Sequence, residues 1–111
     1  MKYHNEKTVV DGHVFDSKLE ARRYKELKIL EKAGYISDLR LQPDYLLIPR
    51  FKKGGRTYRE TRYIADFSYF DRESGQIVVE DTKGVKTDVY KLKKKLFEYK
   101  YPELTIKEVT R

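Results

Sequence analysis

Apolar residues recur along the chain with two different periods, and the longer period predicts two helices. The first helix is expected over residues 17–33, where apolar side chains recur at helical spacing and Gly34 follows as a stop. Its apolar stripe consists of Tyr24, Leu27, Leu30 and Ala33. The second helix is expected within residues 87–101, with an inward face made of Val89, Leu92, Leu96 and Tyr99.

The shorter period, alternation of apolar and polar residues, predicts the strands. Residues 7–15 indicate a small hairpin around Asp11-Gly12. Further strands are expected over residues 39–48, 58–70, 77–83 and 104–109, with a basic turn containing Gly54-Gly55 between the first two. One face of residues 39–48 carries Leu39, Leu41, Tyr45 and Leu47, and one face of residues 58–70 carries Tyr63, Ala65, Phe67 and Tyr69. Pro43 indicates an edge position or a bulge.

After the hairpin, the predicted order is helix, three antiparallel strands, helix and strand. This order indicates an α/β fold, in which a mixed β-sheet is flanked by helices. The length of 111 residues predicts a single domain, residues 1–111. The chain has no cysteine, which excludes disulfides and thiolate metal sites. Because no apolar run suggests a membrane span or a secretory signal, we expect a cytoplasmic protein that does not bind membranes.

The net charge is strongly positive. The chain has 25 Lys and Arg against 18 Asp and Glu, a formal charge of +7, and its pI is about 9.5. Such a balance is typical of nucleic-acid-binding proteins, although a solvated basic surface explains it equally well. Ten tyrosines and five phenylalanines supply most of the large apolar area, and tyrosine can also stack on bases.

Candidate chemistry appears where the predicted strand "VVEDTKG" ends. Strand alternation puts Asp81 and Lys83 on one face and Glu80 and Thr82 on the other. The neighbouring strand delivers Asp66 to the same place, so two carboxylates converge. Converging carboxylates favour a cation between them, and hard oxygen ligands favour Mg²⁺. A surface salt-bridge ladder at a strand end is the alternative interpretation.

This arrangement suits metal-assisted hydrolysis of a phosphodiester, with Lys83 orienting the nucleophile or neutralising charge. Gly84 would let the chain turn away without blocking the phosphate. A third acid could come from the first helix, where Glu20 lies at the margin of the apolar stripe. Ser17 and Glu20 also spell the capping box S-x-x-E, and this local pattern favours the cap over a site role.

Five blocks of the sequence together resemble a known family. They are "FDSKLEARRY", "LQPDYLLIP", "YIADFSYFD", "VVEDTKG" and "YKLKKKLFEYKYP", and the resemblance covers residues 3–109. In this order the blocks resemble a small family of phage and prophage proteins, once a family of unknown function, in the PD-(D/E)XK endonuclease superfamily. These proteins are similar to Holliday-junction resolvases. The resemblance implies a restriction-endonuclease-like fold.

The resemblance also implies roles for individual residues. Asp66 matches the first metal-binding acid, Asp81 the (D/E) position and Lys83 the lysine of the motif, with Ala65 in place of the usual proline. Glu20 matches a helix glutamate of the resolvase-like and transposase-like branches, which makes it a fourth site residue and metal ligand. The backbone carbonyl of Thr82 would complete the ligands of Mg²⁺, for which Mn²⁺ is expected to substitute. Glu80 is the alternative acid to Asp81.

Other polar residues are candidates for contacts outside the metal site. The residues expected to contact DNA phosphates are Lys52, Lys53, Arg56, Arg59 and Arg62 on one hairpin, and Lys86, Lys91, Lys94 and Lys95 on the second helix. Gln42 could reach the site from a neighbouring strand, but an exposed glutamine is the favoured interpretation. His4 and His13 lack ligand partners and are expected at the surface.

The sequence and the resemblance together predict a Mg²⁺-dependent DNA endonuclease that cuts branched DNA during phage DNA processing in the bacterial cytoplasm. Symmetrical cleavage of a branched duplex by so small a chain would require a homodimer. Two alternatives remain open. The chain could be a non-catalytic nucleic-acid-binding module on the same fold, or a nicking or flap nuclease that works with partner proteins.

Overall fold

The computed structural model describes residues 6–83 and 85–110. Its helices are α1 (Lys18–Ala33) and α2 (Asp88–Lys100). The strands that precede the middle of the chain are β1 (Thr8–Val10), β2 (His13–Phe15), β3 (Ile36–Leu41), β4 (Asp44–Ile48) and β5 (Phe51–Lys53). The strands that follow are β6 (Arg56–Tyr58), β7 (Thr61–Ile64), β8 (Phe67–Asp71), β9 (Gln76–Thr82) and β10 (Thr105–Val109).

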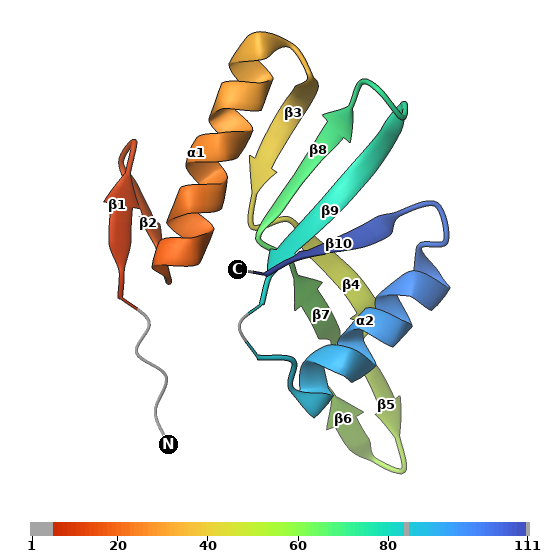
Figure 1. The fold of residues 1–111 in the computed structure, drawn as a ribbon. Coiled ribbons are helices and arrows are strands. Elements are labelled where there is room, and N and C mark those ends of the chain that lie inside the picture. Colours follow the sequence, from red (N-terminus) through yellow and green to blue (C-terminus); the bar gives the residue numbers. More distant parts are fainter. Residues whose placement is uncertain (1–5, 84, 111) are drawn as a thin grey trace.

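A mixed four-stranded sheet of order β10-β9-β8-β3 forms the centre of the fold. β10 is parallel to β9, whereas β8 is antiparallel to both β9 and β3. The connection from β9 to β10 contains α2, as a parallel pair requires. Figure 1 shows α1 and α2 at different sides of this sheet, with the β1–β2 hairpin next to α1. The predicted α/β architecture with a mixed sheet and flanking helices is confirmed.

The core has two parts, which lie on opposite faces of β9. Val78 packs against the part that includes α1, and its neighbour Val79 belongs to the part that includes α2, because successive strand residues face opposite sides. The α1 cluster contains Phe15, Ala21, Tyr24, Leu27, Ile36, Phe67 and Tyr69. The α2 cluster contains Leu47, Tyr63, Ala65, Val79, Tyr90, Phe97 and Ile106. The part of β9 from Val79 to Asp81 is therefore buried from both sides.

Local sequence signals determine α1 and the hairpin before it. The Ser17 hydroxyl accepts a hydrogen bond from the backbone of Glu20 at 3.1 Å, and Gly34 ends the helix in the left-handed conformation. Asp11 and Gly12 both have positive φ, as a tight hairpin turn requires. These predictions are confirmed, except that Ala33 is exposed instead of joining the apolar stripe.

Two predicted strands are each broken at the same level of the fold. Residues 39–48 divide into β3 and β4 at Gln42-Pro43, and the strand predicted over residues 58–70 divides into β7 and β8 at Ala65-Asp66, with Tyr58 left as the end of β6. Across this bend Gln42 donates to the Asp66 carbonyl at 2.9 Å, and Ala65 donates to the Pro43 carbonyl at 3.0 Å. Pro43 cannot donate a ladder bond, which explains why the ribbon bends there. The bulge or edge expected at Pro43 is thus a complete break.

The bend changes which residues share a face. Tyr63 and Ala65 belong to the α2 cluster, whereas Phe67 and Tyr69 belong to the α1 cluster. The prediction that all four line one side of a continuous strand is therefore wrong. The alternation of apolar and polar residues continues unchanged through the bend, so the sequence pattern alone does not show that the chain turns there.

The inward face predicted for α2 is also wrong. Val89, Leu92 and Tyr99 are exposed, and only Leu96 is partly buried. Tyr90 and Phe97 face the core instead, where Phe97 packs edge-on against Tyr45. The aromatic rings fill the space between α2 and the β4–β7 ribbon, and this larger buried area outweighs that of the aliphatic stripe.

The basic turn expected between the predicted strands is a second hairpin, made of β5 and β6 around Gly54-Gly55. Figure 1 shows this hairpin continuing the β4–β7 ribbon away from the central sheet. Within the part of the chain that the structure describes, neither helix is long and apolar enough to cross a membrane.

Candidate functional site

The two adjacent acids of β9 point to opposite faces of the sheet. Glu80 faces α1, and Asp81 faces the α2 side, where Tyr63 lies. Both are buried, with 0% and 2% of their surface exposed. A buried carboxylate is costly unless it is paired, so the partners of each acid indicate its role.

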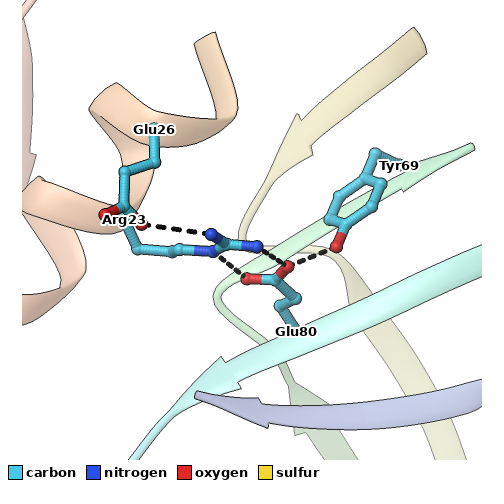
Figure 2. A network of polar contacts seen from close by, with 4 residues as sticks. All are labelled: Arg23, Glu26, Tyr69 and Glu80. Carbon is cyan, nitrogen blue, oxygen red and sulfur yellow. Dashed lines mark hydrogen bonds and ion pairs between the residues drawn. The ribbon is translucent and has the colours of Figure 1, made fainter. Parts of the chain in front are cut away.

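Glu80 is bound within a structural ion pair. Arg23 of α1 donates from Nε to Oε1 at 2.8 Å and from Nη2 to Oε2 at 2.6 Å, and the Tyr69 hydroxyl also donates to Oε2. Figure 2 shows this network, which continues from Arg23 to Glu26. Hydrogen bonding to Glu80 raises the pKa of Arg23. Both carboxylate oxygens of Glu80 are occupied on the face away from Asp81, so Glu80 is a poor alternative to it.

Asp81 lies between a tyrosine and a lysine. It accepts a hydrogen bond from the Tyr63 hydroxyl, and its Oδ1 lies 3.3 Å from the Nζ of Lys83. The pKa of Asp81 is raised to about 6, chiefly by burial and also by the charge of Asp66, while Tyr63 and Lys83 act in the opposite direction. Asp81 and Lys83 share one face, as the alternation predicted.

Asp66 stands at the bend between β7 and β8, next to the end of β9. Its backbone N–H donates to the Glu80 carbonyl at 3.0 Å. Its Oδ2 accepts from both the backbone N–H of Thr82, at 2.6 Å, and the Thr82 hydroxyl, at 2.7 Å. Thr82 therefore fixes the orientation of the Asp66 carboxylate. Asp66 itself lies between two strands, β7 and β8, and not within a continuous strand as predicted.

Glu20 reaches the same region from the first turn of α1. Only 7% of its surface is exposed, and burial raises its pKa to about 7. The negative charges of Asp66, Asp16 and Asp81 contribute to this increase in pKa, whereas Lys83 opposes it. Glu20 is thus close enough to Asp66 and Asp81 to be affected by their charge.

Glu20 makes only one of the two hydrogen bonds that define a capping box. The backbone N–H of Glu20 donates to Ser17 Oγ, which satisfies the helix N-terminus. Among the described residues, the Glu20 carboxylate makes no hydrogen bond to the backbone of Ser17, the reciprocal bond of a capping box. The cap uses the backbone of Glu20, and its side chain remains available.

Lys83 completes the cluster. Its Nζ lies 4.3 Å from the centre of the Tyr90 ring, and it also pairs with Asp81. Such a cation–π contact restricts the ammonium group without neutralising it. The Tyr90 hydroxyl donates to Glu108 at 2.7 Å, which fixes the ring. Asp66, Asp81 and Lys83 thus lie together at the bend and the end of β9, and their charges act on Glu20 of α1.

The donor atoms suit a hard divalent cation. Among residues 6–83 and 85–110, no three His, Cys, Asp or Glu side chains are gathered closely enough to hold a metal as they stand. Glu20, Asp66 and Asp81 nevertheless offer carboxylate oxygens, the ligands that Mg²⁺ prefers. The raised pKa values of Glu20 and Asp81 come partly from the negative charge of Asp66, which a cation would offset. The Thr82 carbonyl follows directly after Asp81, and Gly84 lies outside the described residues.

The basic residues form two separate surfaces. On the α2 surface, Lys86, Lys91, Lys94 and Lys95 line an open groove of 610 Å³ together with Tyr90, Glu98, Tyr99 and Glu108. Two of these lysines are paired with acids, Lys86 with Glu108 at 3.1 Å and Lys94 with Glu98 at 3.9 Å. Because Tyr90 lines the groove and also contacts Lys83, the groove adjoins the acidic cluster.

The second basic surface is the β5–β6 hairpin, where Lys52, Lys53 and Arg56 are exposed, followed by exposed Arg59. Arg62 lies apart from them on β7 and pairs with Asp44 at 3.3 Å and with Glu60 at 3.6 Å. Its charge is thus partly neutralised within the chain. Arg62 is the weakest of the expected phosphate contacts.

Gln42 is near the cluster through its backbone. It bonds the Asp66 carbonyl from a left-handed conformation, while its side chain is exposed. His13 is exposed next to the Tyr24 ring, as expected of a surface residue, and His4 lies outside the described residues.

Several residues around the cluster were not identified from the sequence. Tyr63 bonds Asp81, the Thr82 amide and hydroxyl bond Asp66, and Arg23 neutralises Glu80. Tyr90 supports Lys83. Alternation placed Thr82 on the face opposite Asp81, but it did not predict the bonds from Thr82 to Asp66, and the other contacts also join residues far apart in sequence.

Comparisons with known proteins give little functional information. Neither the curated proteins nor the solved structures include a significant match to this chain. The family that does match is described as a protein of unknown function, DUF1064, and its model covers residues 1–111. The match spans the whole chain, so this protein belongs to the DUF1064 family.

Proposed function

We propose that this protein is a Mg²⁺-dependent endonuclease that hydrolyses phosphodiester bonds in DNA. The observation that carries the proposal is that Asp66, Asp81 and Lys83 lie together at the bend beside the end of β9, where the charges of these residues act on buried Glu20. Glu20 and Asp81 are buried there, and their pKa values are raised to about 7 and about 6. Perturbed acids clustered near a basic groove are typical of catalytic sites.

Each residue of the cluster would have a separate role. Asp66 and Asp81 would hold the cation with the Thr82 carbonyl, and Glu20 would assist from α1. A bound Mg²⁺ supplies Lewis acidity and lowers the pKa of a coordinated water. Thr82 keeps Asp66 in one orientation through two bonds, of 2.6 and 2.7 Å, and Tyr63 does the same for Asp81. Preorientation of this kind removes reorganisation from the reaction.

Lys83 would supply positive charge for the phosphate. Its Nζ lies against Asp81 and over the Tyr90 ring, so it can move between a carboxylate and a substrate oxygen within a fixed region. An ammonium group there can orient the nucleophile or neutralise charge that develops on the phosphate. While no cation is bound, the contact between Lys83 and Asp81 also offsets part of the negative charge of the cluster.

DNA is proposed as the substrate because the cluster lies next to the α2 groove and at the base of the β4–β7 ribbon that leads to the basic hairpin. Lysine-lined surfaces contact phosphates without reading sequence. A preference for branched DNA, and a homodimer to cut it symmetrically, follow from the resemblance to resolvases. We include both in the proposal.

The test is a cleavage assay on four-way junctions, flaps, linear duplex and single strands, with Mg²⁺, Mn²⁺ or EDTA. We expect cleavage of branched DNA with either cation and none in EDTA. Asp81→Asn should abolish cutting and preserve DNA binding, because it removes charge at constant shape. Asp38→Asn is the matched control, since Asp38 is an exposed acid in a left-handed conformation that asparagine also adopts.

The outcomes discriminate between the functions. Equal activity of the Asp81→Asn and Asp38→Asn proteins would contradict the metal site. Binding of DNA without cleavage under any of these conditions would identify a non-catalytic binding module. Cleavage confined to flaps or nicked DNA would retain the chemistry and replace the proposed substrate.

A further inference from the structure

The β5–β6 hairpin exposes a pair of stacked aromatic rings. Phe51 and Tyr58 are cross-strand partners, with ring centroids 4.8 Å apart and planes inclined by 12°. They are 43% and 40% exposed and belong to neither core cluster. Every residue from 49 to 60 is exposed, and Figure 1 shows the hairpin beyond the body of the protein. The two rings therefore remain accessible on a projecting element.

The same face of the hairpin carries positive charge. Cross-strand partners share a face, and side chains two residues apart on one strand share it too, so Lys53 and Arg56 lie beside the two rings. The guanidinium carbon of Arg56 lies 5.5 Å from the centre of the Tyr58 ring. Lys52 and its partner Thr57 occupy the opposite face. One face thus combines two rings with two cations.

The combination of rings and cations on this face is not explained by the stability of the hairpin alone. The ring pair does stabilise the two strands, but Lys53 and Arg56 are directly opposite, and like charges in that position destabilise a sheet. An isolated two-stranded hairpin is also marginal in water. A polyanion that accepts contacts from both cations would remove the repulsion.

The positive charge of the hairpin indicates what kind of partner it binds. Residues 50–59 contain Arg50, Lys52, Lys53, Arg56 and Arg59 and no acidic residue. A second copy of the chain would bring the same cations into contact and would be repelled. A nucleic acid offers phosphates to the cations and base faces to the rings. In an intact duplex the base faces are already stacked, so only unpaired bases can reach Phe51 and Tyr58.

We propose that the β5–β6 hairpin binds unpaired bases of DNA by stacking them on the Phe51–Tyr58 pair, while Lys53 and Arg56 contact the adjacent phosphates. This inference rests on the proposed function for the choice of DNA. It adds that the feature recognised in a branched substrate is the set of bases left unpaired at the branch. Tyr63, at the acidic cluster, lies five positions after Tyr58 along the chain, and five extended residues span roughly 17 Å.

The test measures binding in EDTA, so that it does not depend on cleavage. The probe is a DNA duplex with a short internal loop of unpaired bases that contains 2-aminopurine, compared with the same duplex fully paired. The wild-type protein should bind the looped DNA about tenfold more tightly and change the 2-aminopurine fluorescence by stacking. The Phe51→Ala/Tyr58→Ala protein should lose both the preference and the fluorescence change.

Matched variants separate stacking from charge and from apolar area. Phe51→Leu/Tyr58→Leu keeps apolar side chains without a ring face and should also lose the preference, whereas Tyr58→Phe should retain it. Lys52→Ala, on the opposite face, should weaken binding to both DNAs alike. Melting temperatures of all variants should stay close to that of the wild type, because the mutated side chains lie outside both core clusters.

Equal affinity of the wild type for the two DNAs would overturn the inference, as would an unchanged preference in the Phe51→Ala/Tyr58→Ala protein. Conversion of a dimer to a monomer by that double substitution, measured by sedimentation velocity, would also overturn it and assign the rings to a subunit interface. A protein that prefers looped DNA but cuts nothing when Mg²⁺ is added would contradict the proposed endonuclease and leave the hairpin assignment intact.

Discussion

Arg23 and Glu80 form a two-bond ion pair that joins α1 to the middle of the sheet, with N–O distances of 2.8 and 2.6 Å. Glu80 also stabilises the bend at Asp66, because its backbone carbonyl accepts a hydrogen bond from the Asp66 backbone N–H at 3.0 Å. Arg23 lies one helical turn after Glu20 and shares its side of α1. The pair therefore fixes the rotation of α1 that brings Glu20 towards Asp66.

Removing the arginine should cost considerable stability. Arg23→Met leaves the Glu80 carboxylate buried without its cation, and breaking a buried pair in this way costs about 3–5 kcal/mol. We expect this loss in the free energy of unfolding, measured by urea denaturation. Arg22→Met, at the exposed neighbouring position, should change stability little and serves as the control.

A second substitution tests whether the buried charge is the cause. Glu80→Gln removes that charge and keeps an oxygen that can accept from Tyr69. The Arg23→Met/Glu80→Gln protein should therefore be more stable than Arg23→Met alone. If the double variant is instead less stable by the sum of two independent losses, the network in Figure 2 does not act as a unit.

Two substitutions at the start of α1 separate the cap from the site. Ser17→Ala removes the acceptor of the Glu20 backbone N–H and should cost about 1 kcal/mol of stability, with cleavage retained. Glu20→Gln keeps that backbone bond and should cut the cleavage rate severely at nearly unchanged or higher stability. Normal cleavage by the Glu20→Gln protein, measured on the substrate that the wild type cuts, would leave Glu20 with no role in the site.

The metal-free protein should become less stable as the pH rises through the weakly acidic range. The folded-state pKa of Glu20 is raised from 4.5 to about 7 and that of Asp81 from 3.8 to about 6. A raised carboxyl pKa means that the folded state holds its proton more tightly than the unfolded state. The stabilisation is complete below the unfolded pKa and is lost as the pH rises through the folded pKa.

In EDTA, the melting temperature should therefore fall between about pH 4.5 and pH 7, and the part due to Glu20 is on the order of 3 kcal/mol. Glu20→Gln should flatten the profile over that range. Mg²⁺ should restore stability at neutral pH, because a cation between the carboxylates favours their ionised form. A profile that is unaffected by Glu20→Gln would contradict the assigned environment of this residue.

The sequence predicted those parts of the fold that local chemistry determines. Ser17 and Gly34 mark the ends of α1, and Asp11-Gly12 marks the first hairpin, because caps and tight turns depend on a few adjacent residues. Alternation on β9 also predicted that Asp81 and Lys83 would share a face. Each of these signals is complete within about one turn or one short strand.

Features that depend on distant contacts were not predictable. α2 has an aliphatic stripe and an aromatic stripe at the same helical spacing, and only packing against Tyr45 and Tyr63 selects the face with Phe97. The bend at Asp66 depends on bonds to Gln42 and Pro43, which are more than 20 residues away. The position of Glu20 depends on the Arg23–Glu80 pair, so the local pattern favoured its capping role.

Tyr63 should tune the acidity of Asp81. Its hydroxyl donates to the Asp81 carboxylate, a bond that favours the ionised form and lowers the pKa of Asp81. Tyr63→Phe removes the bond and should raise that pKa, at a cost of about 1 kcal/mol in stability. The acidic limb of the profile of cleavage rate against pH should move to higher pH, because a cation ligand must be ionised. An acidic limb at its wild-type position in the variant would exclude Asp81 as the group that titrates there.

The α2 groove should carry part of the salt dependence of DNA binding. Lys91 and Lys95 line it and are exposed, whereas Lys86 and Lys94 already face acids at 3.1 and 3.9 Å. Each lysine that contacts a phosphate contributes roughly 0.9 to the slope of log affinity against log salt. Lys91→Ala/Lys95→Ala should therefore flatten this slope by roughly 2 and weaken binding to all sequences alike. Lys25→Ala/Lys32→Ala removes the same charge from exposed positions of α1 and should leave the slope nearly unchanged. Equal slopes for the two double variants would place the groove off the DNA path and leave the β5–β6 hairpin as the main phosphate contact.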